Sequence, residues 1–368
     1  MAPPNRRPDN ASQVSKPYEF VEFPPNAPTL TSPAGHHKYL KNRIHGILHL
    51  QLTVETALHI STGTVMMGRD LGQSKIPLIK TMQTGNEKLT IPGSSLKGVV
   101  RSIYEALTVS CVCKIKTQGY QKTKQDGKLR YSLNIPRGYK ECKPKKNEIQ
   151  KRSVKLCPAC RIFGALGFQG LLEFADAKAS NIQSQTGCMP SLHEPQRNCE
   201  EYYVNNRNQI SQGQLNGNLK GRKFYYQTEN VASSNQQKGI PVQQANRQYV
   251  FENKLPFKNL TLAELGALLA SLGQDQDYPF SLKVGAGKPI GMGTMTVKIT
   301  QIQRTESMRD RYSDYNTEPP SLTGSELQTF IKQAIAAAHQ QKLLELPQLK
   351  QLQKILAYPT NREARAEY

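Results

Sequence analysis

One segment constrains the fold more than any other: LTIPGSSLKGVVRSIYEAL, residues 89–107. It predicts a short strand, a Pro-Gly turn and an amphipathic helix capped by Ser94 or Ser95. The apolar residues recur at helical spacing and predict a buried face of Leu96, Val99, Val100, Ile103 and Leu107. The helix starts with serine hydroxyls, free amides and Lys97, and Arg101 follows one turn on. Because free N–H groups and the helix dipole favour anions, this helix start suits a phosphate.

The segments around this unit predict strands with few helices. From Ile44 the sequence GILHLQLTVET largely alternates, as in a strand buried on one face. Residues 261–273 predict a helix with a Thr261/Glu264 capping box and a core stripe of Leu265, Leu268, Leu269 and Leu272. A glycine-rich loop then leads into a strand over 294–302. This order predicts an α+β fold, a βαββαβ ferredoxin-like domain decorated by long insertions.

We expect three parts along the chain. Residues 1–45 are rich in Pro, Asn and Ser and predict an extended arm that orders only against a partner. Residues 46–305 form the ferredoxin-like domain, and residues 306–368 predict a helical extension interrupted at Pro347. Within the domain, the polar stretch 178–217 is too long for an ordinary connection and predicts a functional loop or protruding hairpin.

The charge of the chain points to a polyanionic partner. The 368 residues include 49 Lys+Arg against 28 Asp+Glu, a formal net charge of +21, and phosphate backbones are the obvious partners. A membrane surface would need a basic amphipathic helix or a lipidation signal, and the N-terminal residues offer neither. No apolar stretch approaches the roughly 18 residues of a bilayer span, and no signal peptide is visible. We therefore expect a cytoplasmic RNA binder rather than a secreted, membrane or small-molecule-processing protein.

Two basic segments are candidates for RNA contact. Residues 114–155 hold 14 Lys+Arg against 3 Asp+Glu, so about half of the net charge lies in this insert. A generic charge run is more often a solvated loop, but the flanking cysteines favour a nucleic-acid-facing feature. In KGRKFYYQ, Arg222 and Lys223 lie beside aromatic residues. They can hold phosphates while the rings stack on bases, although a strand with core aromatics explains the same residues almost as well.

Five cysteines within fifty residues indicate a metal site rather than disulfides. Cys157-x-x-Cys160 lets two thiolates bind one tetrahedral Zn²⁺, and the remaining ligands come from Cys111, Cys113 and Cys142. No open coordination position is evident, so we predict a structural zinc at the base of the basic insert. Cys188 and Cys199, with His193, are a second possible cluster, but unpaired thiols in a loop are the favoured interpretation.

Three motifs carry a family resemblance: IPGSSLKGVVRSIYE, CPACRIFG and GAGKPIGMG. Together, over about residues 46–302, they resemble the RAMP superfamily, specifically backbone subunits of type III CRISPR effector complexes. The resemblance implies an RRM-related palm that holds guide RNA while complementary target RNA pairs with it. The stretch 178–217 would be the thumb that displaces bases at a regular interval.

The resemblance also assigns residues and partners. It implies guide-backbone contacts from Ser94, Ser95, Lys97 and Arg101, and an RNA-side loop of Gly285, Gly287, Lys288 and Gly291. The implied partners are guide RNA, target RNA, further RAMP proteins and the large subunit of the complex. The insert between Cys113 and Cys157 is longer than in an ordinary backbone subunit. This departure suggests a specialised subunit present once per complex.

Slicing subunits of this family carry an aspartate in the loop after the first strand. Asp70 is the only carboxylate between Glu55 and Glu87. In cleavage by attack of a target 2′-hydroxyl on the adjacent phosphate, Asp70 would orient or deprotonate the hydroxyl, and Mg²⁺ or another divalent cation would assist. Arg69 would stabilise the phosphorane, and His59 is a more distant proton-transfer candidate.

The residue types alone allow plainer interpretations. An aspartate beside glycine and arginine is more often a turn former, and a histidine in an apolar strand is more often part of the core. The leading hypothesis is thus a guided target-RNA endoribonuclease, and the alternative is a subunit that binds guide RNA without cutting. A zinc-containing DNA-binding regulator is a third hypothesis.

Overall fold

The computed structural model describes residues 16–85, 88–112, 118–122, 128–150, 153–180, 184–190, 192, 210–211, 214–232, 239–304, 313 and 320–365. Its central feature is an eight-stranded antiparallel sheet. The strand order is β18 (Leu282–Lys283), β19 (Thr294–Arg304), β2 (Ile44–Val54), β17 (Val250–Leu260), β11 (Ala177–Ala179), β6 (Lys88–Ile91) and β5 (Thr84–Gly85), with β20 (Ser321–Leu322) paired to β19. In β2, Leu48, Leu50, Leu52 and Val54 are buried, which matches the predicted alternation.

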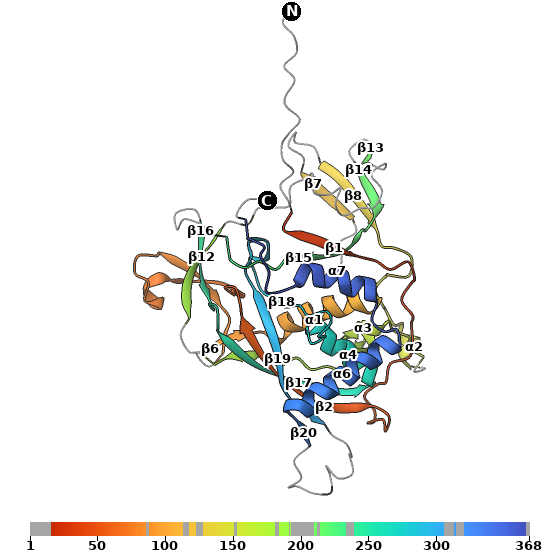
Figure 1. The fold of residues 1–368 in the computed structure, drawn as a ribbon. Coiled ribbons are helices and arrows are strands. Elements are labelled where there is room, and N and C mark those ends of the chain that lie inside the picture. Colours follow the sequence, from red (N-terminus) through yellow and green to blue (C-terminus); the bar gives the residue numbers. More distant parts are fainter. Residues whose placement is uncertain are drawn as a thin grey trace, which may run out of the picture.

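Helices lie against this sheet and share one hydrophobic core with it (Figure 1). They are α1 (Gly93–Leu107), α3 (Pro158–Phe163), α4 (Leu262–Ser271), α6 (Gly324–Gln340) and α7 (Leu346–Leu356). The short helix α2 (Lys146–Gln150) has no described residue in this core. The Thr261/Glu264 capping box is present at α4. The α+β fold class predicted from the sequence is confirmed, because a curled antiparallel sheet packs against helices as in a ferredoxin-like domain.

The start of α1 differs from the prediction. Its N-cap is Pro92, and neither Ser94 nor Ser95 caps the helix. Instead, a carboxylate oxygen of Asp176 accepts a hydrogen bond from the Gly93 N–H at 2.8 Å. A distant acidic side chain therefore satisfies one of the amides that the sequence suggested for a phosphate.

Smaller sheets flank the central one. One contains β12 (Gln185–Pro190), β16 (Gly239–Gln244), β4 (Leu78–Met82) and β3 (Ser61–Met67), and the short 3₁₀ helix η1 (Gly68–Leu71) follows β3. Another contains β13 (Ile210–Ser211), β14 (Gln214–Asn218), β8 (Lys128–Asn134) and β7 (Gln118–Lys122). β14 and β8 pair in parallel, so the polar stretch 178–217 meets the basic insert. β9 (Gly164–Ala165) and β10 (Phe168–Gln169) form a short hairpin.

Both terminal segments pack onto this core. In the arm, β1 (Tyr18–Glu22) pairs with β15 (Gly221–Tyr225), and Val21 is buried. The expectation that the arm orders only against a partner is therefore wrong for this part, because its apolar residues find a place on the same chain. At the other end, α6 and α7 contribute buried residues to the core. Pro347 lies in the first turn of α7, where its missing N–H leaves no helical bond unmade.

Candidate functional site

Predicted RNA-binding residues from three separate segments meet at one cavity of about 570 Å³, here called the groove. Ser94 and Ser95 come from the start of α1, Lys223 from β15, and Gly285 and Lys288 from the glycine-rich loop. The remaining polar lining includes Ser61, Ser102 and Lys283. The lining residues of the groove thus include three lysines and four serines and no carboxylate.

Local backbone requirements explain how these segments reach the groove. A Cβ on Gly93 would lie 2.0 Å from the Phe174 carbonyl oxygen, so only glycine lets α1 begin so close to the chain before β11. Gly285 has a φ of +80°, which glycine adopts without strain, and its loop approaches His59 closely. The Ala286 N–H donates to the His59 carbonyl at 2.9 Å and holds the loop there.

Lys283 is a groove residue that the sequence analysis missed. Its side chain is 5 % exposed, and its Nζ donates to the Gly291 carbonyl and to Thr294 Oγ1, each at 3.1 Å. Burial, with the nearby Lys288 charge, lowers the pKa of Lys283 to about 7. Burial also lowers the pKa of Lys288. The position of Lys283 two residues before Gly285 is the signal that would have pointed to it.

The structure places other predicted RNA-binding residues outside the groove lining. Lys97 lines a separate cavity of about 540 Å³ with Tyr39 and His45. Burial, followed by the charge of Arg101, lowers the pKa of Lys97. Arg222 lies over the Phe23 ring and donates to backbone carbonyls, as described below. Gly287 and Gly291 flank the 3₁₀ turn η4 (Lys288–Ile290) with φ of +69° and +93° and thus shape the loop.

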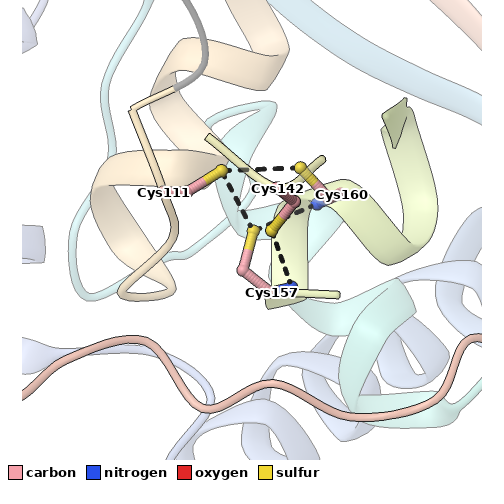
Figure 2. Close-up of side chains that lie close together, drawn as sticks. All are labelled: Cys111, Cys142, Cys157 and Cys160. Atoms are coloured by element: carbon pink, nitrogen blue, oxygen red, sulfur yellow. Dashed lines mark hydrogen bonds between the residues drawn. The ribbon is translucent and has the colours of Figure 1, made fainter. Parts of the chain in front are cut away.

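Four buried cysteines, Cys111, Cys142, Cys157 and Cys160, form a cluster whose sulfur atoms all lie within 4.8 Å of one another (Figure 2). The Sγ of Cys111 is 3.5 Å from the Sγ atoms of both Cys157 and Cys160. That is far longer than a disulfide of about 2.05 Å and near the roughly 3.8 Å between two sulfurs on a tetrahedral Zn²⁺. The donor set therefore fits a metal such as zinc.

The predicted metal ligands also included Cys113, and a second possible cluster contained Cys188, Cys199 and His193. Cys113 lies outside the described residues, as do Cys199 and His193 of the second possible cluster. Cys188 lies in β12 and does not belong to the cluster of four.

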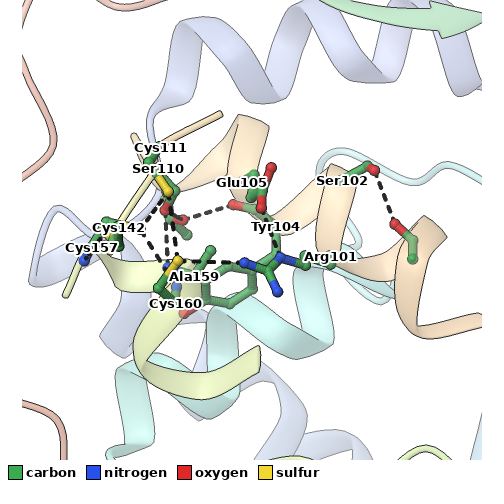
Figure 3. Close-up of polar contacts among 12 residues, drawn as sticks. Arg101, Ser102, Tyr104, Glu105, Ser110, Cys111, Cys142, Cys157, Ala159 and Cys160 are labelled. Atoms are coloured by element: carbon green, nitrogen blue, oxygen red, sulfur yellow. Dashed lines mark hydrogen bonds and ion pairs between the residues drawn. The ribbon is translucent and has the colours of Figure 1, made fainter. Parts of the chain in front are cut away.

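Two arginines, Arg101 and Arg222, connect the cysteine cluster to the rest of the fold, and Figure 3 shows Arg101 beside the cluster. Arg101 Nη2 donates to Cys160 Sγ at 3.4 Å, and its Nε donates to Glu105 at 2.8 Å. Arg222 Nη2 donates to the Cys111 carbonyl at 3.0 Å. Hydrogen bonds from the other thiols, Cys111 first, strongly lower the pKa of Cys157. These cations would offset the net negative charge of four thiolates around one Zn²⁺.

Asp70 and Arg69 lie in η1, immediately after β3. Arg69 Nε is 3.7 Å from Asp70 Oδ1, and the side chains are 74 % and 50 % exposed. Solvent screens such a pair, so both side chains are available to a ligand. A Cβ on Gly68 would lie 1.9 Å from the Ile76 carbonyl oxygen, so glycine is required for this turn.

His59 is not part of the Asp70 turn. It is 1 % exposed, and its Nδ1 is 2.7 Å from the Gln243 carbonyl. Burial lowers its pKa and favours the neutral ring. The seven residues of β3 separate it from η1, which corresponds to roughly 20 Å of extended chain. His59 is thus packed in the core, and its role as a more distant proton-transfer candidate stays a prediction.

These features together define an α+β protein with a carboxylate-free basic groove at a helix start and a buried metal-type cysteine cluster. A family model described as the RAMP superfamily matches residues 51–296, and the chain belongs to that superfamily. Its members are generally CRISPR-associated RNA-binding proteins. No curated protein matches the chain. Within the part of the chain that the structure describes, no helix is long and apolar enough to cross a bilayer.

Proposed function

We propose that this chain is a subunit of a type III CRISPR effector complex and binds the guide-RNA backbone in the groove. The observation that carries the proposal is the convergence of Ser94, Ser95, Lys223, Lys283 and Lys288 in a lining without carboxylates. Serine hydroxyls and lysine ammonium groups are donors for phosphate oxygens. Phe224 and Tyr225 also line the groove and offer ring surfaces to bases.

Substitution of Ser94 by Glu tests this binding site. The side chain is exposed in the first turn of α1, so a carboxylate there interacts favourably with the helix dipole but repels phosphate. We expect Ser94→Glu to keep the thermal stability and to weaken single-stranded RNA binding roughly tenfold, about 1.4 kcal/mol. Ser94→Gln, of the same size without charge, should bind nearly as the original chain does.

Two results would count against the proposal. Equal RNA affinity of the Ser94→Glu and Ser94→Gln variants would show that the groove does not bind RNA. Duplex DNA that outcompetes single-stranded RNA at physiological salt would favour the DNA-binding regulator instead.

We further propose that Asp70 makes the complex a target-RNA endoribonuclease. The target 2′-oxygen would attack the adjacent phosphorus as Asp70 takes or orients its proton, and the bond to the 5′-oxygen would break. Arg69 would stabilise the charge that develops on the phosphate. Among the described residues, no group of three or more ligands surrounds Asp70. A divalent cation would therefore take its other ligands from RNA phosphates and water.

Binding without cleavage is the second candidate function. The observation that favours it concerns the surroundings of Asp70. Its ion-pair partner is Arg69, and the His59 ring is buried against the Gln243 carbonyl. Asp70→Asn in the assembled complex distinguishes the two, with the exposed Asp277→Asn as control. Loss of the regular target-cleavage ladder with Asp70→Asn alone supports catalysis. An unchanged ladder leaves only the binding function.

We also propose that the metal at the four-cysteine cluster is a structural zinc. Four buried sulfur ligands leave no open coordination position, as in structural rather than catalytic zinc sites. Through Arg101 and Arg222, the cluster is linked to α1 and β15, the two elements that also line the groove.

A further inference from the structure

Residues 16–17 of the arm and 362–365 of the C-terminal tail, here called the two ends, lie outside the family match and meet beside the glycine-rich loop. The Tyr226 N–H donates to the Pro17 carbonyl at 3.0 Å, and the Glu229 N–H donates to the Arg362 carbonyl at 2.8 Å. The Ala364 N–H donates to the side chain of Asn230 at 2.9 Å. These backbone contacts hold the arm and the C-terminal tail against the segment that follows β15.

The two ends enclose a second basic cavity of about 410 Å³, here called the tail pocket. Its charged lining consists of Lys16, Arg362 and Arg365 against one carboxylate, Glu363. In the part of the chain that the structure describes, Lys16 and Arg365 take part in no ion pair. The tail pocket therefore carries positive charge that the described part of the fold does not neutralise.

Arg362 is held in place before any ligand arrives. Its guanidinium lies 4.0 Å from the centroid of the Tyr226 ring, and its Nη1 donates to the Lys354 carbonyl at 3.2 Å. A guanidinium has five N–H donors, so most of them remain for a phosphate. Because the side chain is already ordered, binding costs little further side-chain entropy.

The tail pocket adjoins the groove at two places. On one side, Tyr225 lines the groove and Tyr226 lines the tail pocket. On the other, Lys288 lines the groove and Pro289 lines the tail pocket. At both places, residues consecutive in the sequence thus line the two cavities.

We propose that the tail pocket binds phosphodiester groups of the same RNA strand that occupies the groove, so that the chain ends extend the RNA site beyond the family core. This inference rests on the proposed RNA-binding function of the groove. Lys16, Arg362 and Arg365 supply the cationic contacts, and the strand leaves the groove past the Lys288–Pro289 turn.

The test compares two double variants of the full chain. Arg362→Gln/Arg365→Gln removes two cations of the tail pocket. The control, Lys332→Gln/Lys350→Gln, removes two exposed cations of α6 and α7. Fluorescence anisotropy follows binding of single-stranded RNAs of roughly 4 and roughly 12 nucleotides over a salt series. Arg365→Gln alone is included because this exposed side chain has no polar partner among the described residues, so its loss leaves the fold intact.

We expect the tail variant to weaken binding of the longer RNA roughly five- to tenfold and to reduce its salt slope by about 1.4 relative to the control. Binding of the shorter RNA should change little, and Arg365→Gln should show about half of the slope change. Equal slopes for tail variant and control on the longer RNA would overturn the inference. If Ser94→Glu weakens RNA binding in the same assay, the proposal that the groove binds RNA is supported, even when the tail-pocket variants show no effect.

Discussion

Lys283 both holds the glycine-rich loop in place and lines the groove. Its ammonium is buried and holds the Gly291 carbonyl, and it also lines the cavity where we expect phosphate. Burial makes its charged form costly in the free protein, which explains the lowered pKa. A phosphate nearby would favour the charged form, so Lys283 combines a structural role with an electrostatic one.

The lowered pKa predicts a pH dependence of stability. The pKa of Lys283 is about 7 in the folded chain and 10.5 as the ordinary value of a lysine. At a pH between these two values, Lys283 is protonated in the unfolded chain and deprotonated in the folded chain. The free energy of unfolding should therefore rise with pH across this window, by at most about 1.4 kcal/mol per unit. Below the pKa of the folded state, Lys283 is protonated in both states, and its contribution to the free energy of unfolding no longer changes with pH.

Urea unfolding at about pH 7 and about pH 9.5 measures this effect. Lys283→Met should show a smaller rise, because Lys97 and Lys288, whose pKa burial also lowers, still contribute. The exposed Lys298→Met should keep the full rise. Parallel behaviour of Lys283→Met and the original chain would show that Lys283 keeps its ordinary pKa in the fold.

Among the elements, the cysteine cluster joins three segments that are separate in the sequence. Cys111 follows α1, Cys142 precedes α2, and Cys157 and Cys160 lie at the start of α3. Cys157 Sγ accepts from the Cys160 N–H at 3.5 Å, as expected for a thiolate at a short helix start. The helix α3 has only six residues, so core packing of Ile162 and Phe163, together with the metal, should hold it rather than helix propensity.

Removal of a cluster ligand should therefore destabilise the protein strongly. We expect Cys157→Ser to lower the free energy of unfolding by at least ~4 kcal/mol and to release the metal. Cys188→Ser, outside the cluster, should change stability by less than about 1 kcal/mol. Elemental analysis and thermal unfolding with and without a chelator measure both effects. If a chelator leaves the thermal unfolding of the original chain unchanged, the proposed structural metal is contradicted.

At the scale of the whole molecule, the C-terminal helix α6 belongs to the core although it lies outside the family match. It packs against α4, and Gly266 is the point of closest approach. A Cβ at Gly266 would lie 1.9 Å from the Ala334 carbonyl oxygen. The two helices can approach this closely only because this position has no side chain.

Two glycine-to-alanine substitutions in helix interiors test this packing. Gly266→Ala should destabilise the protein by about 2 kcal/mol or more, because a rigid backbone clash outweighs the gain in helix propensity. Gly98→Ala in α1 meets open space and should stabilise by roughly 0.5–1 kcal/mol through that same propensity. Thermal unfolding compares them, and a stabilising Gly266→Ala would show that α6 is not docked there.

Features that depend on neighbouring residues could be predicted from the amino-acid sequence. Alternation predicted β2, the Thr261/Glu264 pair predicted the cap of α4, and the Cys157-x-x-Cys160 spacing predicted two metal ligands. The motifs around Ser94 and Gly285 indicated the family and two walls of the groove. Such patterns are visible because strand periodicity, helix caps and short ligand loops are local.

Contacts between distant segments could be found only in the tertiary structure. It brought Cys111 and Cys142 to the CPAC motif, placed Arg101 and Arg222 beside the cluster, and buried His59 against the Gln243 carbonyl. It also used Asp176 to cap α1 and added Lys283 to the groove. The physical reason is that a side chain takes the partner that packing places nearest, and local sequence carries no record of that distance.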